Sequence, residues 1–254
     1  MNGSIFSGIY WINRLTMAEA DMKKTIMAIL LFDFMAGMLF LGFYGMRSRA
    51  VVADSGIVQV AQEERLEDAD VKKIAITFDD GPHPSYTAQL LDGLKERGIH
   101  ATFFVTGEHA KLHPDIIKRM FDEGHLIGNH TYSHIQLTKN NREKFKDELI
   151  KTNEILKEIT GEEIQYVRPP YGSWDKSFEK ELNMFPVLWT VDPLDWSSRN
   201  VGRITEKIVS KTGENDIILM HDYYDTSVTA ALRAIDELLE EGYTFVTVEE
   251  ILFD

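Results

Sequence analysis

Cysteine is absent from the 254 residues of this chain. Its absence excludes disulfide bonds, cysteine nucleophiles and thiolate metal sites together. A chain without cysteine is typical of a bacterial exported domain that folds without covalent cross-links.

Positive charge is scarce as well. The chain carries 27 lysine and arginine residues against 41 aspartate and glutamate residues, a formal net charge of −14. Residues 51–254 hold 22 of these basic residues and 38 of the acidic ones. Such a balance excludes nucleic acid as a partner, because binding to phosphates needs clustered lysine and arginine. Internal repeats and low-complexity segments are also absent.

Only one long apolar run is present, over residues 25–46. It has the length needed to cross a bilayer, so we expect a transmembrane signal-anchor. Asp33 near its middle is unfavourable in hydrocarbon and leaves a buried amphipathic or an interfacial helix as an alternative. Cleavage near Ala53 would instead make the run a signal peptide, although Arg47 and Arg49 lie between the run and that cleavage position.

The flanking composition gives the domain organisation. Residues 1–24 make a short N-terminal tail, and the polar, acidic residues 47–70 are expected to be a linker. Residues 71–254 are long enough to bury a sizeable core and are expected to form one α/β domain.

Strand-like and helix-like stretches alternate within this domain. The strand-like stretches lie near residues 72–78, 101–105, 125–129, 164–168, 186–191, 216–221 and 243–248. Alternation with short connections predicts a parallel sheet, and seven or eight such units predict a closed or nearly closed β/α barrel.

Polar motifs follow five of these predicted strands. They are Asp79-Asp80, His130 with His134, Arg168-Pro-Pro-Tyr-Gly172, Asp192-Pro-Leu-Asp-Trp196 and His221-Asp222. The active site of a β/α barrel lies at the C-terminal ends of its strands, so we expect these segments to converge.

Two imidazoles and one carboxylate are the ligands expected of a catalytic divalent metal that keeps positions open. His130 and His134, at i and i+4, can both reach one ion if their segment is helical. One of Asp79 and Asp80 then completes the set. The other is free to act as a base toward a metal-bound water, which is the expected nucleophile.

The remaining motifs suggest supporting roles. Arg168 is suited to hold an aspartate ionised and oriented. The Pro169-Pro170 pair makes its loop rigid, which leaves the backbone N–H of Tyr171 available for a developing oxyanion.

His221 follows a buried strand, and facing a carboxylate such as Asp195 it would have a raised pKa and act as a general acid. Trp196 and Leu219 are suited to wall a small apolar pocket. The other histidines that carry no such role are expected to be structural or exposed: His83, His100, His109, His113 and His125.

Together the motifs resemble a known family. The ordered set is Thr77-Phe-Asp-Asp-Gly81, His130-Thr-Tyr-Ser-His134, Arg168-Pro-Pro-Tyr171, Asp192-Pro-Leu-Asp-Trp196 and Leu219-Met-His221-Asp222. It resembles the polysaccharide deacetylases with a NodB homology domain, carbohydrate esterase family 4. All five family motifs are present in order, and the resemblance covers roughly residues 70–254.

The resemblance implies a distorted β/α barrel and metal-dependent hydrolysis of N-acetyl groups on glycans. By motif position, Asp79 would be the catalytic base and Arg168 would orient it. Asp80, His130 and His134 would be the metal ligands. Tyr171 would supply the oxyanion N–H. His221 would be the acid, tuned by Asp195, while Trp196 and Leu219 would line the acetyl pocket.

Peptidoglycan N-acetylglucosamine is the expected substrate, because anchored members of the family act outside the cytoplasmic membrane. Chitin or chitooligosaccharide deacetylases and acetylxylan esterases share the motifs and remain alternatives. A catalytically silent wall-binding scaffold is an alternative of another class. We expect a monomer on the cell membrane, with one pass, an extracellular catalytic domain and one divalent ion: zinc, or else cobalt, nickel or iron.

Overall fold

The computed structural model describes residues 71–253. The predicted tail 1–24, anchor 25–46 and linker 47–70 lie outside the described residues. Within residues 71–253, each helix is too short or too polar to cross a membrane.

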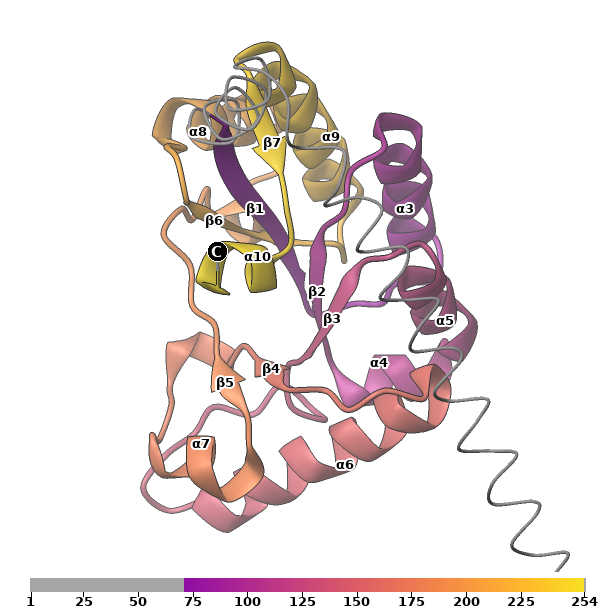
Figure 1. Ribbon diagram of the computed structural model, residues 1–254, viewed down its shortest axis with the longest axis vertical. Coiled ribbons are helices and arrows are strands. Elements are labelled where there is room, and N and C mark those ends of the chain that lie inside the picture. The colour runs from indigo at the N-terminus through magenta and orange to yellow at the C-terminus, as the bar shows by residue number, and fades with distance from the viewer. Residues whose placement is uncertain (1–70, 254) are drawn as a thin grey trace, which may run out of the picture. The chain divides into compact units, whose positions relative to one another are not determined.

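Seven strands make one curled sheet in the described part of the chain (Figure 1). They are β1 (Lys72–Asp79), β2 (Thr102–Val105), β3 (Leu126–Asn129), β4 (Tyr166–Val167), β5 (Phe185–Pro186), β6 (Ile217–His221) and β7 (Tyr243–Phe245). The order along the sheet is β5-β4-β3-β2-β1-β6, and β7 pairs with the beginning of β1. Every pairing is parallel, as the strand–helix alternation predicts.

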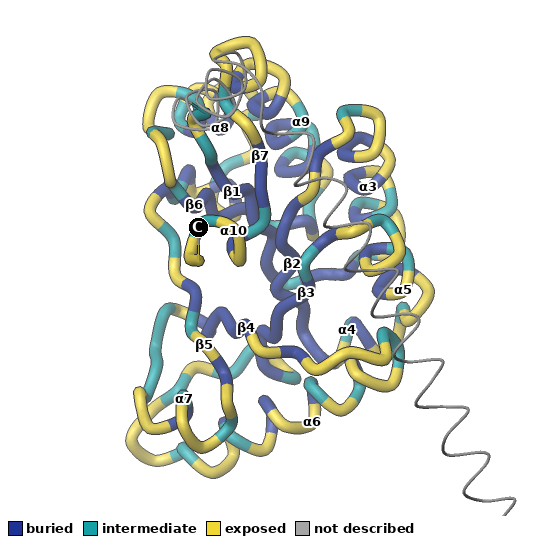
Figure 2. The backbone as a smooth tube through the Cα atoms, in the orientation of Figure 1, coloured by how far each residue is buried: buried dark blue, intermediate teal, exposed yellow. Residues whose placement is uncertain are grey.

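Alternate residues of the strands point to opposite faces of the sheet. In β1, Ile74, Ile76 and Phe78 face the main hydrophobic core. Ala75 belongs to a separate, inner cluster with Phe104. Both faces of the central strands are therefore buried, which is why these strands are continuous apolar runs in the sequence (Figure 2).

Helices surround the sheet. Their bounds are α3 (Tyr86–Arg97), α4 (Gly107–Leu112), α5 (Pro114–Asp122), α6 (Arg142–Thr160), α7 (Ser177–Leu182), α8 (Val201–Lys211), α9 (Asp225–Glu240) and α10 (Val248–Phe253). Apolar residues of α3, α5, α8 and α9 pack into the main core. Helix α10 lies inside the curl, where Val248 and Ile251 join the inner cluster (Figure 1).

The barrel prediction is confirmed in its coarse form, since the parallel sheet curls, but it does not form a regular closed barrel. The predicted strand 186–191 is reduced to β5, which has two residues. An isolated parallel bridge between Val191 and Ile218 then links the segment after β5 back to β6. Within the described residues, backbone pairing across the open side of the curl is thus confined to residues 190–191 with residues 217–219. The curl positions the C-terminal strand ends around one region.

Candidate active site

The predicted site residues meet at the C-terminal edge of the sheet. Asp79 is the last residue of β1 and pairs in register with Phe104 of β2 and with His221 of β6. On the other side, β3 ends at Asn129, directly before His130, and pairs there with Val167 of β4, directly before Arg168. Register therefore brings four of the five predicted motifs to one edge.

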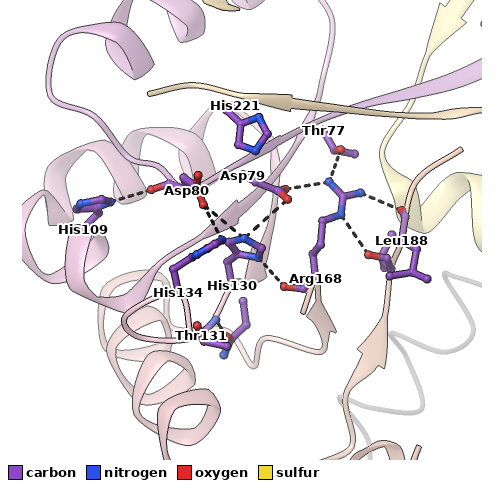
Figure 3. A network of polar contacts seen from close by, with 12 residues as sticks. Thr77, Asp79, Asp80, His109, His130, Thr131, His134, Arg168, Leu188 and His221 are labelled. Atoms are coloured by element: carbon purple, nitrogen blue, oxygen red, sulfur yellow. Dashed lines mark hydrogen bonds and ion pairs between the residues drawn. The ribbon is translucent and has the colours of Figure 1, made fainter. Parts of the chain in front are cut away.

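Asp80, His130 and His134 form a possible site for a divalent metal. Asp80 Oδ1 lies 3.5 Å from Nε2 of His130 and 3.4 Å from Nε2 of His134 (Figure 3). That carboxylate oxygen is buried and has no hydrogen-bond partner. Its distances to the two imidazole nitrogens are longer than those of ordinary hydrogen bonds. A buried, unpaired carboxylate oxygen facing two imidazole nitrogens fits a cation well.

The two ligand histidines are oriented for this role. Nδ1 of His130 donates a hydrogen bond of 2.5 Å to the backbone oxygen of Arg168, which directs Nε2 toward Asp80. Burial lowers the pKa of His134 below its ordinary value, with a further contribution from the neighbouring His130. Burial acts to raise the pKa of Asp80, but its contacts with His130 and the other histidines outweigh burial and lower that pKa to about 2.

The segment that carries His130 and His134 is not helical, so the helical condition under which both could reach one ion is not met. Residues 130–134 form a loop in which Thr131 and His134 have φ angles of 62° and 56°, in the left-handed region. The first turn of α4 holds this loop, because Gly107 N–H donates to the Thr131 carbonyl and Glu108 N–H to the Tyr132 carbonyl. The loop, rather than helical spacing, brings both imidazoles to Asp80.

Arg168 is fully buried and holds Asp79. Its Nη1 donates to Asp79 Oδ1 at 2.9 Å and to Thr77 Oγ1 at 2.5 Å, while Nε and Nη2 donate to the carbonyls of Val187 and Leu188 (Figure 3). Burial lowers the pKa of Arg168, whereas the charge of Asp79 acts to raise it. The guanidinium remains charged, so Asp79 has a fixed cationic partner.

His221 and Asp195 form the second charged pair. Asp195, in the short 3₁₀ helix η2 (Asp195–Ser197), accepts hydrogen bonds from both the backbone N–H and Nδ1 of His221, at 3.0 and 2.9 Å. Burial alone would lower the pKa of His221, but the bond to Asp195 and the nearby carboxylates raise it to about 9. His221 is therefore a proton donor at neutral pH.

A cavity of about 370 Å³ collects these groups. It is lined by Asp79, Asp80, His130, His134, Tyr171, Trp196, Leu219 and His221, which were all predicted, and by Pro169, Trp189 and Asp192. Arg168 and Asp195 are buried behind the wall. The geometry thus brings together all ten predicted side chains, eight facing the cavity and two supporting them.

Comparison with known proteins identifies the family. The sequence profile described as polysaccharide deacetylase matches residues 67–187. A peptidoglycan-N-acetylglucosamine deacetylase of Bacillus cereus is 38% identical over 189 residues, which are 71% of this chain and 88% of that protein. The chain belongs to the polysaccharide deacetylase family.

Two further similarities concern PdaC of Bacillus subtilis. The sequence named peptidoglycan-N-acetylmuramic acid deacetylase PdaC is 39% identical over 77% of this chain, but the chain spans only 42% of that longer relative. The solved structure of peptidoglycan deacetylase PdaC matches with a TM-score of 0.69 at 40% identity, over 72% of this chain and 90% of that one.

Unusual backbone geometry is concentrated at the site. Seven non-glycine residues among 71–253 have positive φ: Asp80, Thr131, His134, Tyr171, Asn183, Leu194 and Asn215. The two asparagines adopt this conformation readily, but the other five all lie in the site loops. Such residues cost about 1–3 kcal/mol each and persist where the surroundings hold them, which is characteristic of functional sites.

Sequence reasoning missed two supporting residues. His109, expected to be structural or exposed, donates from Nδ1 to the Asp80 carbonyl at 2.7 Å (Figure 3). Glu148 of α6 accepts from both N–H and Oγ of Ser133 in the histidine loop. His109 lies just beyond the end of β2, the one early strand whose end was not considered. Glu148 carried no comparable signal.

Proposed function

We propose that this protein is a metal-dependent hydrolase that removes N-acetyl groups from N-acetylglucosamine residues of peptidoglycan. One observation carries the proposal. Two proton-transfer groups, Asp79 and His221, line the same cavity as the metal-binding set Asp80, His130 and His134. Amide hydrolysis needs these parts together: a proton acceptor for the attacking water, a donor for the leaving nitrogen and a cation.

Zinc is the proposed ion, held by Asp80, His130 and His134. Two histidines and one carboxylate are a usual ligand set for catalytic zinc, and they also accept cobalt, nickel or iron. When bound, such an ion polarises the acetyl carbonyl and makes water more acidic.

Asp79 takes the proton from the water that attacks the acetyl carbonyl carbon. Its Oδ1 is occupied by Arg168, and its Oδ2 lies 3.8 Å from Nε2 of His130, so the second oxygen is directed toward the metal site. Arg168 holds Asp79 in one orientation, because four hydrogen bonds fix the guanidinium.

His221 gives its proton to the sugar nitrogen as the carbon–nitrogen bond breaks, which releases acetate and a free amine. Asp195 keeps that proton on the imidazole until this step. The N–H of Tyr171 is proposed to stabilise the oxyanion of the tetrahedral intermediate. Trp196 and Leu219, on the cavity wall, are proposed to contact the acetyl methyl group.

Support for peptidoglycan comes from the two relatives described above, which are both named for this polymer. They are named for two different sugars, N-acetylglucosamine and N-acetylmuramic acid. We favour N-acetylglucosamine, and we propose that the domain acts outside the cytoplasmic membrane, anchored by the apolar run 25–46.

The test is acetate release by the full chain from N-acetylated peptidoglycan, chitopentaose and acetylxylan, each with chelator and with added zinc or cobalt. We expect peptidoglycan to be the best substrate, with activity that chelator abolishes and metal restores. Preference for chitopentaose would change the proposed polymer and keep amide hydrolysis. Preference for acetylxylan would change the reaction to ester hydrolysis at the same metal site. Absence of release from all three by metal-loaded protein would overturn the proposal.

Substitution of Asp79 by Asn separates an enzyme from a wall-binding scaffold. An enzyme should lose activity by about 10²–10⁴-fold while still binding metal, because Asp79 is outside the ligand set. Metal content, measured beside acetate release, is the control. A scaffold would retain its wall binding in this variant and release no acetate in either form.

A further inference from the structure

Four aromatic rings lie together next to the metal site, and the mechanism above uses none of them. We name His83, Tyr86, His109 and Tyr223 the Tyr223 cluster. His83 stacks on Tyr86 with ring centroids 4.3 Å apart, and His109 stacks on Tyr223 at 5.3 Å. His83 meets Tyr223 edge to face at 5.1 Å. The rings come from the loop after β1, from α3, from α4 and from the loop after β6.

The cluster is held in place by backbone hydrogen bonds. Nδ1 of His83 accepts from the N–H groups of Ser85 and Tyr86, both at 3.2 Å. Nδ1 of His109 donates to the Asp80 carbonyl at 2.7 Å. Because the two imidazoles that contact Tyr223 are fixed, the tyrosine ring is positioned before any ligand arrives, which reduces the entropy lost on binding.

The cluster adjoins the catalytic cavity. Tyr223 follows His221 by two residues, and His109 contacts Asp80 directly. In Figure 3, His109 lies beyond Asp80, on the side away from Arg168. Tyr223 is 37% exposed, so part of its ring is free at the surface. Tyr171 and Trp196, also exposed, belong to the cavity itself, whereas the Tyr223 cluster lies outside its lining.

A second metal site does not explain the histidines of this cluster. Among residues 71–253, only Asp80, His130 and His134 bring three ligand atoms within 4.8 Å of one another. The Tyr223 ring contacts both His83 and His109. The chemistry of the cluster is instead that of a rigid ring surface with polar groups at its edges.

We propose that the Tyr223 cluster binds a pyranose ring of the substrate chain next to the sugar that is deacetylated. A pyranose has an apolar face of C–H groups and a rim of hydroxyls, which matches a partly exposed tyrosine ring bordered by its own hydroxyl and by imidazole nitrogens. This proposal rests on the proposed function, because the occupant is the polymer whose acetyl group reaches the metal site. Under this proposal, Tyr223 favours long substrate chains over short ones.

The experiment compares two substrates in the metal-loaded full chain. Chitopentaose can reach the cluster from the metal site, whereas 4-nitrophenyl acetate is too small. We expect Tyr223→Ala to lower the ratio of kcat/KM for chitopentaose to kcat/KM for the ester about fivefold, mainly through KM. Tyr223→Phe should lower it less, because it keeps the ring and loses only the hydroxyl. Phe121→Ala, at an equally exposed aromatic residue of α5, is the matched control and should leave the ratio unchanged.

Binding without turnover separates this proposal from the proposed function. Chitopentaose affinity is measured by calorimetry in the Asp79→Asn chain with Tyr223 and with Tyr223→Ala, and we expect a loss of about fivefold. An unchanged ratio together with unchanged affinity would overturn the cluster as a sugar site while leaving the deacetylase intact. Equal losses on both substrates would also overturn it, because Tyr223 would then act through His221 or Asp80.

Discussion

Two histidines in one cavity have their pKa values moved in opposite directions. Burial lowers the pKa of His134, so its imidazole is neutral and available as a ligand. His221 is buried too, but its bond to Asp195 overcomes burial and raises the pKa to about 9. His134 also faces a carboxylate, Asp80, at 3.4 Å, but that contact does not outweigh burial. The hydrogen bond to Asp195 therefore distinguishes the proton donor His221 from the metal ligand His134.

Asp195→Asn tests this difference. An amide cannot stabilise the imidazolium, so burial would dominate and the pKa of His221 would fall. The acid must be protonated to act, so activity is lost as pH rises through this pKa, and the basic limb of the kcat/KM profile should move to lower pH. The measurement is the pH profile of acetate release for both proteins. An unmoved basic limb would assign that limb to another group.

Tyr171 is predicted to act through its backbone. Its φ of 58° is strained for any residue with a Cβ, and its side chain is 66% exposed. Tyr171→Gly and Tyr171→Ala both keep the N–H, so kcat should stay within about tenfold of the wild type for both. The glycine variant should be more stable than the alanine variant by about 1 kcal/mol, since glycine accepts positive φ freely.

Denaturant unfolding of the two Tyr171 variants and acetate release measure the two effects. A loss of kcat of about 10²-fold or more in both variants would show that the side chain takes part in the reaction, because that is the size expected when an oxyanion donor is removed.

At the scale of elements, helix α6 determines the shape of the histidine loop. Glu148 is buried, and its two carboxylate oxygens accept from N–H and Oγ of Ser133 at 2.9 and 2.7 Å. Asn129 is tied to the same helix, because its side-chain amide donates to the Leu149 carbonyl and to Asn153. These contacts link residues far apart in the sequence, so local patterns indicated the histidine pair but not the loop that brings both imidazoles to one point.

Glu148→Ala should weaken metal binding about tenfold, because groups that orient metal ligands typically contribute 10- to 100-fold to affinity. Titration with zinc measures this affinity, and Glu148→Gln should restore part of it since the amide can still accept and donate. Glu158→Ala, at an exposed position of the same helix, is the control. Equal zinc affinity in the Glu148→Ala and Glu158→Ala variants would show that the contact between Glu148 and Ser133 does not contribute to metal binding.

For the whole molecule, the sequence predicted the parallel α/β architecture and the convergence of the site, because both follow from local signals. Buried apolar runs mark the strands, and the polar residue after each run lies at the same edge of the sheet. Closure was not predictable in this way. It depends on how far the curl brings Val191 toward Ile218, a distance that no local pattern encodes.

Metal binding should stabilise the whole domain, because its ligands come from separate strands. Asp80 follows β1 and the two histidines follow β3, with β2 between them in the sheet. The unfolded chain lacks this arrangement, so zinc at 100 times its Kd should add about 2.7 kcal/mol to the free energy of unfolding. For a domain of this size, Tm should rise by about 5–10 °C.

Thermal unfolding with zinc and then with excess chelator measures this gain. Asp80→Asn should lose most of the metal-dependent rise, because an amide oxygen is a weaker ligand than a carboxylate, whereas Glu158→Ala should retain it. The rise should also shrink as pH falls and protons compete for His130 and His134. If chelator left the Tm of the wild type unchanged, the three side chains would not bind metal in the folded state, and the proposed chemistry would lose its cation.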